Sequence, residues 1–315
     1  ITREHNILIK MSASIFTTQT VSPAISSAVM YGGRSYTNWV LPLSKTPNTE
    51  TIGYSCEQAH AKNNGIDVPG IEGRHDPVLT FALQGLFKTP LQNFRISEAI
   101  GTKNGPYDFI GQGPDNKPGA TISMKSNYCG DKVAPQRIGQ ATKKRFMEHF
   151  DIPKSSPELS QNDTIKTYIL ENIETMLPEY LKHLNCCDWI IYIDGQINKK
   201  EQKPCLGTVT DEFISRCQAK GYDIFPITYT VKNVRWFHKT FLEDVRFDQS
   251  KFTFTKSTIA EWNESTTVKY NSVTIGEFQI HNNRDCVKFR FHFKNLLHIA
   301  DTRIICQDFK MATQI

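Results

Sequence analysis

An aspartate and a lysine lie on either side of a turn that is rich in proline and glycine. The turn is Gly-Pro-Asp-Asn-Lys-Pro-Gly over residues 113–119, and Asp108 comes shortly before it. If the flanking segments pair as antiparallel strands, Asp108 lies opposite Ser123. Lys125 is then one pleat further along the same face, because side chains alternate along a strand. We therefore expect the carboxylate and the ammonium group to converge at the open end of a hairpin.

These two groups could carry out phosphate chemistry together. A carboxylate at this position can hold a divalent cation such as Mg²⁺. A lysine beside the metal can orient or deprotonate a water molecule and offset the charge that develops on a phosphate oxygen. An ordinary cross-strand ion pair would use the same two residues. The choice between the two interpretations therefore depends on the elements that surround them.

The chain from residue 75 onward predicts a helix, three meandering strands, a second helical region and a further strand. Asp76 is suited to cap the first helix, and Pro77 is suited to its first turn. Alternation and turn residues place the later elements. The predicted ranges are a helix over 77–87, strands over 94–100, 107–111 and 120–125, a helix over 135–150, one or two helices over 165–184 interrupted at Pro178, and a buried strand over 188–194.

This order of elements resembles the PD-(D/E)xK nuclease superfamily, and within it the type II restriction endonucleases. The resemblance covers roughly residues 75–194 and depends on Tyr-Asp-Phe-Ile at 107–110 and Ile-Ser-Met-Lys at 122–125. It implies an α/β (α+β) fold with a restriction-endonuclease-like core, in which helices flank a central mixed sheet. It also implies Mg²⁺-dependent hydrolysis of DNA phosphodiester bonds by a homodimer, with Asp108 as metal ligand and Lys125 as catalytic lysine.

The sequence departs from the family pattern at the second acid. Ser123 stands where the (D/E)xK acid is expected, and we include it among the candidate catalytic residues. One branch of the restriction enzymes has Ser or Ala there and takes its acid from the next helix. The corresponding segment here, residues 135–140, contains no acid, so Gln136 or Gln140 could supply a neutral amide oxygen instead.

The first acid and a further metal-binding carboxylate also need to be assigned. A literal Pro-Asp occurs at Asp115, but this residue is at the tip of the turn and far from the lysine. The upstream candidates for a second metal ligand are Glu72, Asp76 and Glu98. We favour Glu72 or Asp76, because both are near the start of the first predicted helix.

Positive charge is concentrated after the turn. The chain has 315 residues, 37 Lys+Arg, 32 Asp+Glu and a net charge of +5. Residues 115–145 alone carry a net +5, which suits contacts with phosphates beside a scissile bond, although a solvated helix face would look similar. The basic residues of this segment are Lys117, Lys125, Lys132, Arg137, Lys143, Lys144 and Arg145.

A short helix is expected from residue 211 to 219, and the chain is rich in β-structure after it. Over residues 287–294 apolar and basic residues alternate, which predicts one face in a core and one uniformly basic face that includes Lys288 and Arg290. The preceding turn at 281–285 fits a reader of a DNA groove, since Arg pairs with guanine and Asn with adenine. An ordinary surface hairpin has the same pattern. The turn contains Asn282, Asn283 and Arg284.

These patterns predict three segments and an intracellular location. We expect an arm with loops at 1–70, a nuclease-like catalytic core at 71–220 and a β-rich DNA-recognition region at 221–315. Eight cysteines without zinc-ligand spacing are typical of reduced thiols in a cytoplasmic protein. No apolar run is long enough to span a membrane, and no signal peptide is recognisable near the N-terminus.

The sequence thus favours a sequence-specific endonuclease that acts on double-stranded DNA with Mg²⁺. Two alternatives remain at this stage. One is a non-catalytic DNA-binding protein on a nuclease-like fold, because an expected carboxylate is missing. The other is a structural or assembly protein whose basic face binds protein. Nucleotide hydrolysis and dinucleotide binding are disfavoured, because neither glycine-rich phosphate-binding fingerprint occurs.

Overall fold

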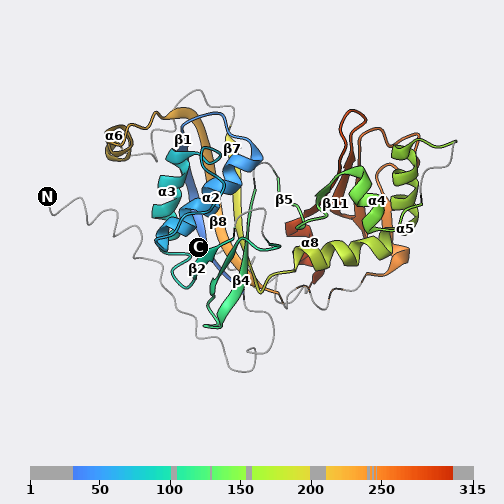
Figure 1. Ribbon diagram of the computed structural model, residues 1–315, viewed down its shortest axis with the longest axis horizontal. Coiled ribbons are helices and arrows are strands. Elements are labelled where there is room, and N and C mark those ends of the chain that lie inside the picture. The colour runs from blue at the N-terminus through green and yellow to red at the C-terminus, as the bar shows by residue number, and fades with distance from the viewer. Residues whose placement is uncertain are drawn as a thin grey trace.

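The computed structural model contains two six-stranded sheets, each packed against helices (Figure 1). The first sheet is mixed, and the second is formed mainly by the C-terminal part of the chain. This arrangement confirms the expected α/β fold with a flanked central mixed sheet and a β-rich C-terminal region. The structure describes residues 31–100, 105–127, 130–153, 158–198, 211–239, 242, 245 and 247–300.

The first sheet contains the predicted hairpin. Its strands β4 and β7 run parallel and all other neighbours are antiparallel. Phe109 lies opposite Ile122, so the register expected from the turn is confirmed. In spatial order the strands are β1 (Tyr31–Leu43), β8 (Phe225–His238), β7 (Trp189–Asn198), β4 (Pro118–Ser126), β3 (Phe109–Gln112) and β2 (Arg95–Ala99).

Helices α2 (Thr49–Asn63) and α3 (Pro77–Phe87) cover one face of this sheet. Asp76 caps α3 as expected, because its side chain accepts a hydrogen bond from the Leu79 amide. Strand β7 is buried on both faces: Trp189 and Ile191 pack with α2 and α3, whereas Ile190 and Tyr192 pack with the second core. This strand therefore connects the two cores.

The second sheet and its helices form the other lobe in Figure 1. Its core is rich in aromatic side chains, and Tyr180 of α5 stacks on Phe289 of β12. The 3₁₀ turn Gln249–Lys251 comes directly before β9. Helix α6 (Asp211–Ala219) belongs to the first lobe (Figure 1). The strands are β5 (Lys132–Val133), β12 (Val287–His292), β11 (Val273–Ile280), β10 (Ser265–Tyr270) and β9 (Phe252–Phe254), with β6 (Gln140–Ala141) also paired to β12; the helices are α4 (Lys143–His149), α5 (Gln161–Leu184) and α8 (Phe293–Ala300).

The predicted helix over 135–150 is wrong in its first half. Residues 136–138 form a turn, residues 140–141 form β6, and only α4 is helical. A side chain at Gly139 would collide with the backbone oxygen of Pro135, so this tight turn needs glycine. Pairing with β12, which is distant in sequence, overrides the local helical pattern.

Helix α5 is interrupted at Asn172 rather than at Pro178. Asn172 has non-helical angles (φ −126°, ψ 21°), and its side chain donates to the carbonyl of Tyr168 one turn earlier. A side chain that forms a hydrogen bond with a backbone carbonyl of its own helix in this way is a recognised cause of a kink. Figure 1 shows two differently oriented parts of α5.

The sheets draw on segments that cross the expected domain boundaries. Strand β1 and helix α2 fall within the expected arm, yet both belong to the first lobe. Strand β8 falls within the expected recognition region, yet it pairs with β1 and β7. Local patterns predict strands but not their distant partners, which explains the difference. Residues 1–30 of the expected arm lie outside the described residues.

Asp188 joins the start of β7 to β4. Its carboxylate accepts from the amide and the hydroxyl of Thr121, both at 3.0 Å, and pairs with Lys239 at 3.1 Å. Burial alone would raise the pKa of Asp188, but the bonds from Thr121 and Lys239 outweigh burial and lower the pKa to about 2.

We expect Asp188→Asn to lower the free energy of unfolding by about 1–3 kcal/mol at pH 7. The loss should shrink as the pH falls from about 4, the usual pKa of an unfolded aspartate, towards 2, because the native carboxylate then becomes protonated. Urea unfolding at several pH values would measure this difference. Asp151→Asn, at an exposed aspartate, is the control and should change stability by less than about 0.5 kcal/mol. Equal stabilities of Asp188→Asn and the parent at pH 7 would contradict the prediction.

None of the helices in the described part of the chain combines the length and the apolar character needed to cross a membrane.

Candidate active site

The carboxylate of Asp108 lies at the open edge of β4, immediately before β3 begins at Phe109. Strand β4 continues beyond its partner from Ser123 onward. One oxygen of Asp108, Oδ2, accepts from the Ser123 hydroxyl at 2.9 Å and from the Met124 amide at 2.7 Å. No described residue donates to the other oxygen, Oδ1. The expected alignment of Asp108 with Ser123 is confirmed, and the carboxylate is held by one oxygen while the other is available.

Lys125 follows on the same strand, one pleat beyond Ser123. It is partly buried, and within the described ranges its ammonium group makes no ion pair. Its charge nevertheless acts on the titration of Glu57 and of Cys186, so it lies close to both groups. The lysine is therefore positioned beside the aspartate without being neutralised by it in a simple salt bridge.

A third charged group, Glu57, comes from α2. This helix crosses the end of β4 closely enough that a side chain at Gly53 would meet the Ser126 hydroxyl at 3.9 Å. Glu57 lies one helical turn after Gly53. Its pKa is raised well above the usual value, first by burial and then by the charge of Asp108, while Lys125 acts in the opposite direction. Glu57, Asp108 and Lys125 thus form one electrostatic cluster, which we call the acidic–lysine cluster.

Sequence reasoning did not select Glu57. No motif marks it, and its proximity to Asp108 depends on the packing of α2 on β4. One feature could have pointed to it. Glu57 is an acid within a helical stretch, residues 51–61, whose other side chains are almost all buried. An acidic side chain in such a stretch costs stability unless a partner compensates for its burial, so it marks a candidate functional residue.

The upstream carboxylates predicted as metal ligands are used elsewhere. Asp76 is buried, and besides capping α3 it accepts from the amide and the hydroxyl of Ser44, each at 2.8 Å. Glu72 is exposed and accepts from the Gly70 amide. Neither residue contacts Asp108 or Lys125 in the described part of the chain. Among the described residues, Glu57 is instead the acid whose ionisation responds to the charge of Asp108.

Gln136, rather than Gln140, reaches the cluster. Its side-chain amide donates to the Ser123 hydroxyl at 3.2 Å, and its backbone amide donates to the His183 carbonyl of α5. Gln140 is exposed on β6 opposite Lys288. Because the segment is a turn followed by a strand and not a helix, these two glutamines do not share a face. Ser123 is fully buried and links Gln136 to Asp108, so it holds the carboxylate in place.

Two adjacent thiols lie near Lys125. Cys186 donates to the Pro106 carbonyl and lies 3.6 Å from the sulfur of Cys187. The bond from Cys187 lowers the pKa of Cys186 to about 7 against the effect of burial, and the charge of Lys125 acts in the same direction. The five described cysteines are free, as expected for reduced thiols: Cys56, Cys186, Cys187, Cys217 and Cys286. Cys129, Cys205 and Cys306 lie outside the described residues.

The outward face of β12 is less basic than the sequence indicated. Apolar and basic residues do alternate along the strand, as predicted. However, Glu277 of β11 lies opposite Arg290 and pairs with Lys132 of β5 at 2.5 Å. Arg290 in turn donates to Gln279. The expectation of a uniformly basic face is wrong here, because neighbouring strands contribute acidic and amide groups.

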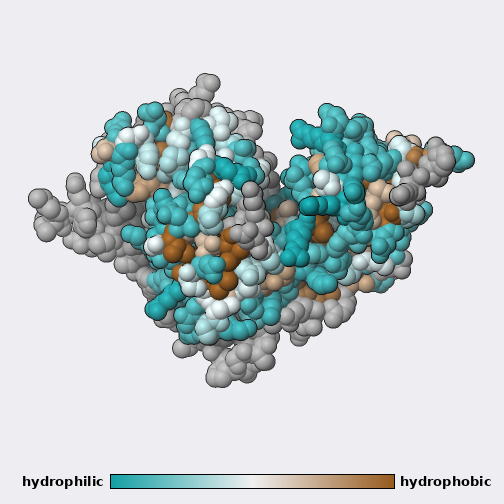
Figure 2. Space-filling view, viewed as in Figure 1, coloured by the Kyte–Doolittle hydropathy of each residue, from teal (hydrophilic) through white to brown (hydrophobic). Residues whose placement is uncertain are grey.

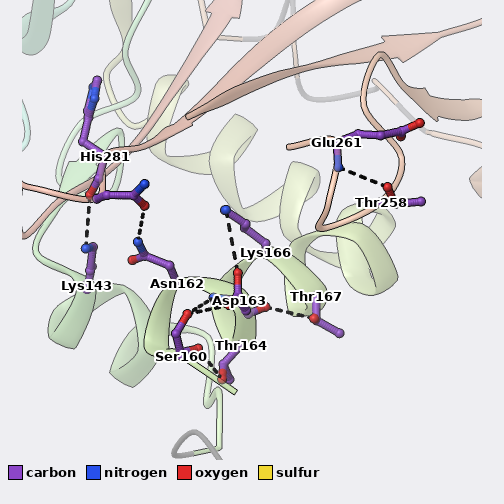
Figure 3. Close-up of polar contacts among 11 residues, drawn as sticks. Lys143, Ser160, Asn162, Asp163, Thr164, Lys166, Thr167, Thr258, Glu261 and His281 are labelled. Carbon is purple, nitrogen blue, oxygen red and sulfur yellow. Dashed lines mark hydrogen bonds and ion pairs between the residues drawn. The ribbon is translucent and has the colours of Figure 1, made fainter. Parts of the chain in front are cut away.

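The turn at 281–285 is fixed against two helices (Figure 3). The ammonium group of Lys143 donates to the His281 carbonyl, and Lys143 is buried. Asn162 of α5 donates to the side chain of Asn282. Lys143 therefore serves an internal contact and does not present its charge to a phosphate, contrary to the expectation from the sequence.

The other predicted DNA-contact residues are more accessible. Arg137 is exposed directly beside Gln136, and Lys144 is exposed with a loose contact to Glu148 at 3.9 Å. Figure 2 shows an indentation between the two lobes whose visible walls are hydrophilic, which suits a polar partner. At the turn and on β12, the remaining candidates are Asn283 and Arg284, which are exposed, and Lys288, which is partly exposed.

One of the comparisons with known proteins finds a relative. No protein-family model matches the chain, and no solved structure matches it. The chain is 36% identical over 178 residues to the type II restriction enzyme CviAII of Paramecium bursaria Chlorella virus 1. The match covers 56% of this chain and 40% of that enzyme, so the chain spans less than half of its relative's length. Over more than half of its own length, this protein is therefore related in sequence to a type II restriction enzyme.

Proposed function

We propose that this protein is a type II restriction enzyme, a Mg²⁺-dependent endonuclease that cleaves double-stranded DNA at a specific sequence. The observation that carries the proposal is the convergence of Glu57, Asp108 and Lys125 at the open edge of β4. The similarity to CviAII supports it.

The acidic–lysine cluster fits a divalent cation. Two neighbouring carboxylates repel each other, which contributes to the raised pKa of Glu57. A cation between them would relieve this repulsion, and oxygen donors are the ligands that Mg²⁺ prefers. The carboxylate of Glu57 and the available Oδ1 of Asp108 would hold the ion. Once bound, Mg²⁺ would activate a water molecule and stabilise negative charge on a phosphate.

The protein's own groups have distinct roles in this proposal. Ser123 and the Met124 amide fix one oxygen of Asp108, so the carboxylate does not rotate away. The ammonium group of Lys125 orients the attacking water and offsets charge on the phosphate as the bond breaks. Gln136 holds Ser123, and Arg137 beside it is suited to a phosphate near the cleaved bond.

We further propose that DNA contacts come from the accessible basic and amide groups. The charged groups of Arg137, Lys144 and Lys288 would bind phosphates. On the turn, Asn283 and Arg284 would form hydrogen bonds with base edges. A homodimer is the simplest assembly for cleaving both strands of a symmetric site. Lys132, Arg290 and Asn282 would shape this surface through their contacts with Glu277, Gln279 and Asn162.

Incubation of the purified protein with plasmid DNA and Mg²⁺ tests the proposal. Discrete fragments that require Mg²⁺ are expected. Salt-sensitive retardation of DNA without cleavage would favour the non-catalytic DNA-binding protein, and the absence of both would favour an assembly protein. Lys125→Ala should abolish cleavage, whereas Lys88→Ala, at an exposed lysine after α3, should retain it. Full cleavage by Lys125→Ala would disprove the assigned role.

A further inference from the structure

A second cluster of ligand-forming side chains lies in the other lobe, away from the acidic–lysine cluster. His149 ends α4, whereas Glu179 and His183 lie one turn apart on α5. The Nε2 atoms of His149 and His183 lie 3.6 and 3.2 Å from the same carboxylate oxygen, Oε1 of Glu179. All three donor atoms lie within 4.8 Å of one another. We propose that His149, Glu179 and His183 form a binding site for a zinc ion, or for a similar transition metal, that joins α4 to α5.

The spacing of the donor atoms fits tetrahedral coordination. Zinc is bound by imidazole nitrogen and carboxylate oxygen at about 2.0–2.1 Å, which places neighbouring donors in a tetrahedron about 3.3 Å apart. The two nitrogen–oxygen separations, 3.6 and 3.2 Å, are close to that value. Only the two imidazoles need to approach each other further, and His149 is exposed enough to rotate.

The surroundings favour one coordinating oxygen. The other carboxylate oxygen of Glu179, Oε2, lies 3.6 Å from Lys182, which leaves Oε1 directed to the two histidines. His183 is only partly exposed, and its Nε2 already lies 3.2 Å from Oε1 of Glu179, so the carboxylate fixes the imidazole in place. Imidazole nitrogens select zinc and its neighbours over magnesium.

A metal here would connect directly to the candidate active site. The carbonyl of His183 accepts from the backbone amide of Gln136, whose side chain bonds Ser123 beside Asp108. By fixing His183 against α4, the ion would restrain the turn that carries Gln136. The proposed site does not depend on the proposed nuclease activity, because it is defined by binding.

Zinc binding to the full-length chain tests the inference. The titration uses the double variant Glu57→Gln/Asp108→Asn as the background variant, because it lacks the competing carboxylates of the acidic–lysine cluster. After chelator treatment, titration with Zn²⁺ against a chromophoric competitor should show one strong site, and Zn²⁺ should raise the melting temperature by a few degrees. Cobalt bound at the same site should give the visible absorption typical of tetrahedral Co²⁺.

Separate substitutions identify the ligands. His149→Ala and Glu179→Gln, both at partly exposed side chains, should each weaken zinc binding at least about tenfold and abolish the thermal shift. His281→Ala removes another histidine beside a carboxylate, Glu264, and should leave zinc binding unchanged. The inference is overturned if the background variant binds no stoichiometric zinc, or if His149→Ala and Glu179→Gln both retain it.

Discussion

Asp108→Asn is expected to reduce the rate of DNA cleavage by about 10³-fold or more while the protein stays folded. Asparagine keeps the shape of the side chain, and its oxygen can still accept from the Met124 amide at the edge of β4. It loses the negative charge that would hold Mg²⁺, and a catalytic metal ion contributes several kcal/mol to transition-state stabilisation. Single-turnover cleavage of plasmid DNA, with circular dichroism and melting curves alongside, would measure both effects.

Asp115→Asn is the matched control for this experiment. Asp115 belongs to the turn of the same hairpin, where, among the residues that the structure describes, its carboxylate accepts from the Lys117 amide alone. Its replacement should leave cleavage within about twofold of the parent, since substitutions away from the site have small effects. If Asp108→Asn cleaved DNA as fast as Asp115→Asn, Asp108 would not be the metal ligand.

Glu57→Gln is expected to have opposite effects on activity and on stability. Cleavage should fall about 10²–10³-fold, because one of the two metal-binding carboxylates is lost. In the presence of a chelator, the variant should be more stable than the parent by about 1 kcal/mol at neutral pH, since a neutral amide replaces an acid whose ionisation is opposed by burial and by Asp108. Glu50→Gln, in the first turn of the same helix, weakens a surface pair with Arg74, while its amide oxygen can still accept from the Tyr54 hydroxyl, and it is the control.

The difference in stability between Glu57→Gln and the parent should increase as the pH rises. Burial and Asp108 raise the pKa of Glu57 in the folded state, so the native protein binds this proton more tightly than the unfolded chain does. The stability linked to Glu57 is therefore complete below its unfolded pKa of about 4.3 and is lost as the pH rises towards the folded pKa. The advantage of Glu57→Gln should grow over the same range. Denaturant unfolding in chelator would show this, and a difference independent of pH would contradict it.

Local patterns in the sequence were sufficient for the hairpin that carries Asp108 and Lys125. The proline- and glycine-rich turn fixes where the chain reverses, and the period of two then determines which side chains share a face. The alternation along β12 and the capping of α3 by Asp76 followed from equally local rules. Each of these features depends on residues that are close in sequence or directly paired across one turn.

The tertiary structure alone decided what surrounds that hairpin. Glu57 reaches Asp108 because α2 packs across β4, and Gln136 reaches Ser123 because the turn before β6 is held by α5. The His281 carbonyl and Glu277 engage Lys143 and Lys132, two residues that the sequence predicted as DNA contacts. Such contacts join segments that are far apart along the chain, and they arise from packing that no local periodicity encodes. The sequence therefore determined the two residues at the centre of the candidate site, and the packing of distant segments determined their charged neighbours.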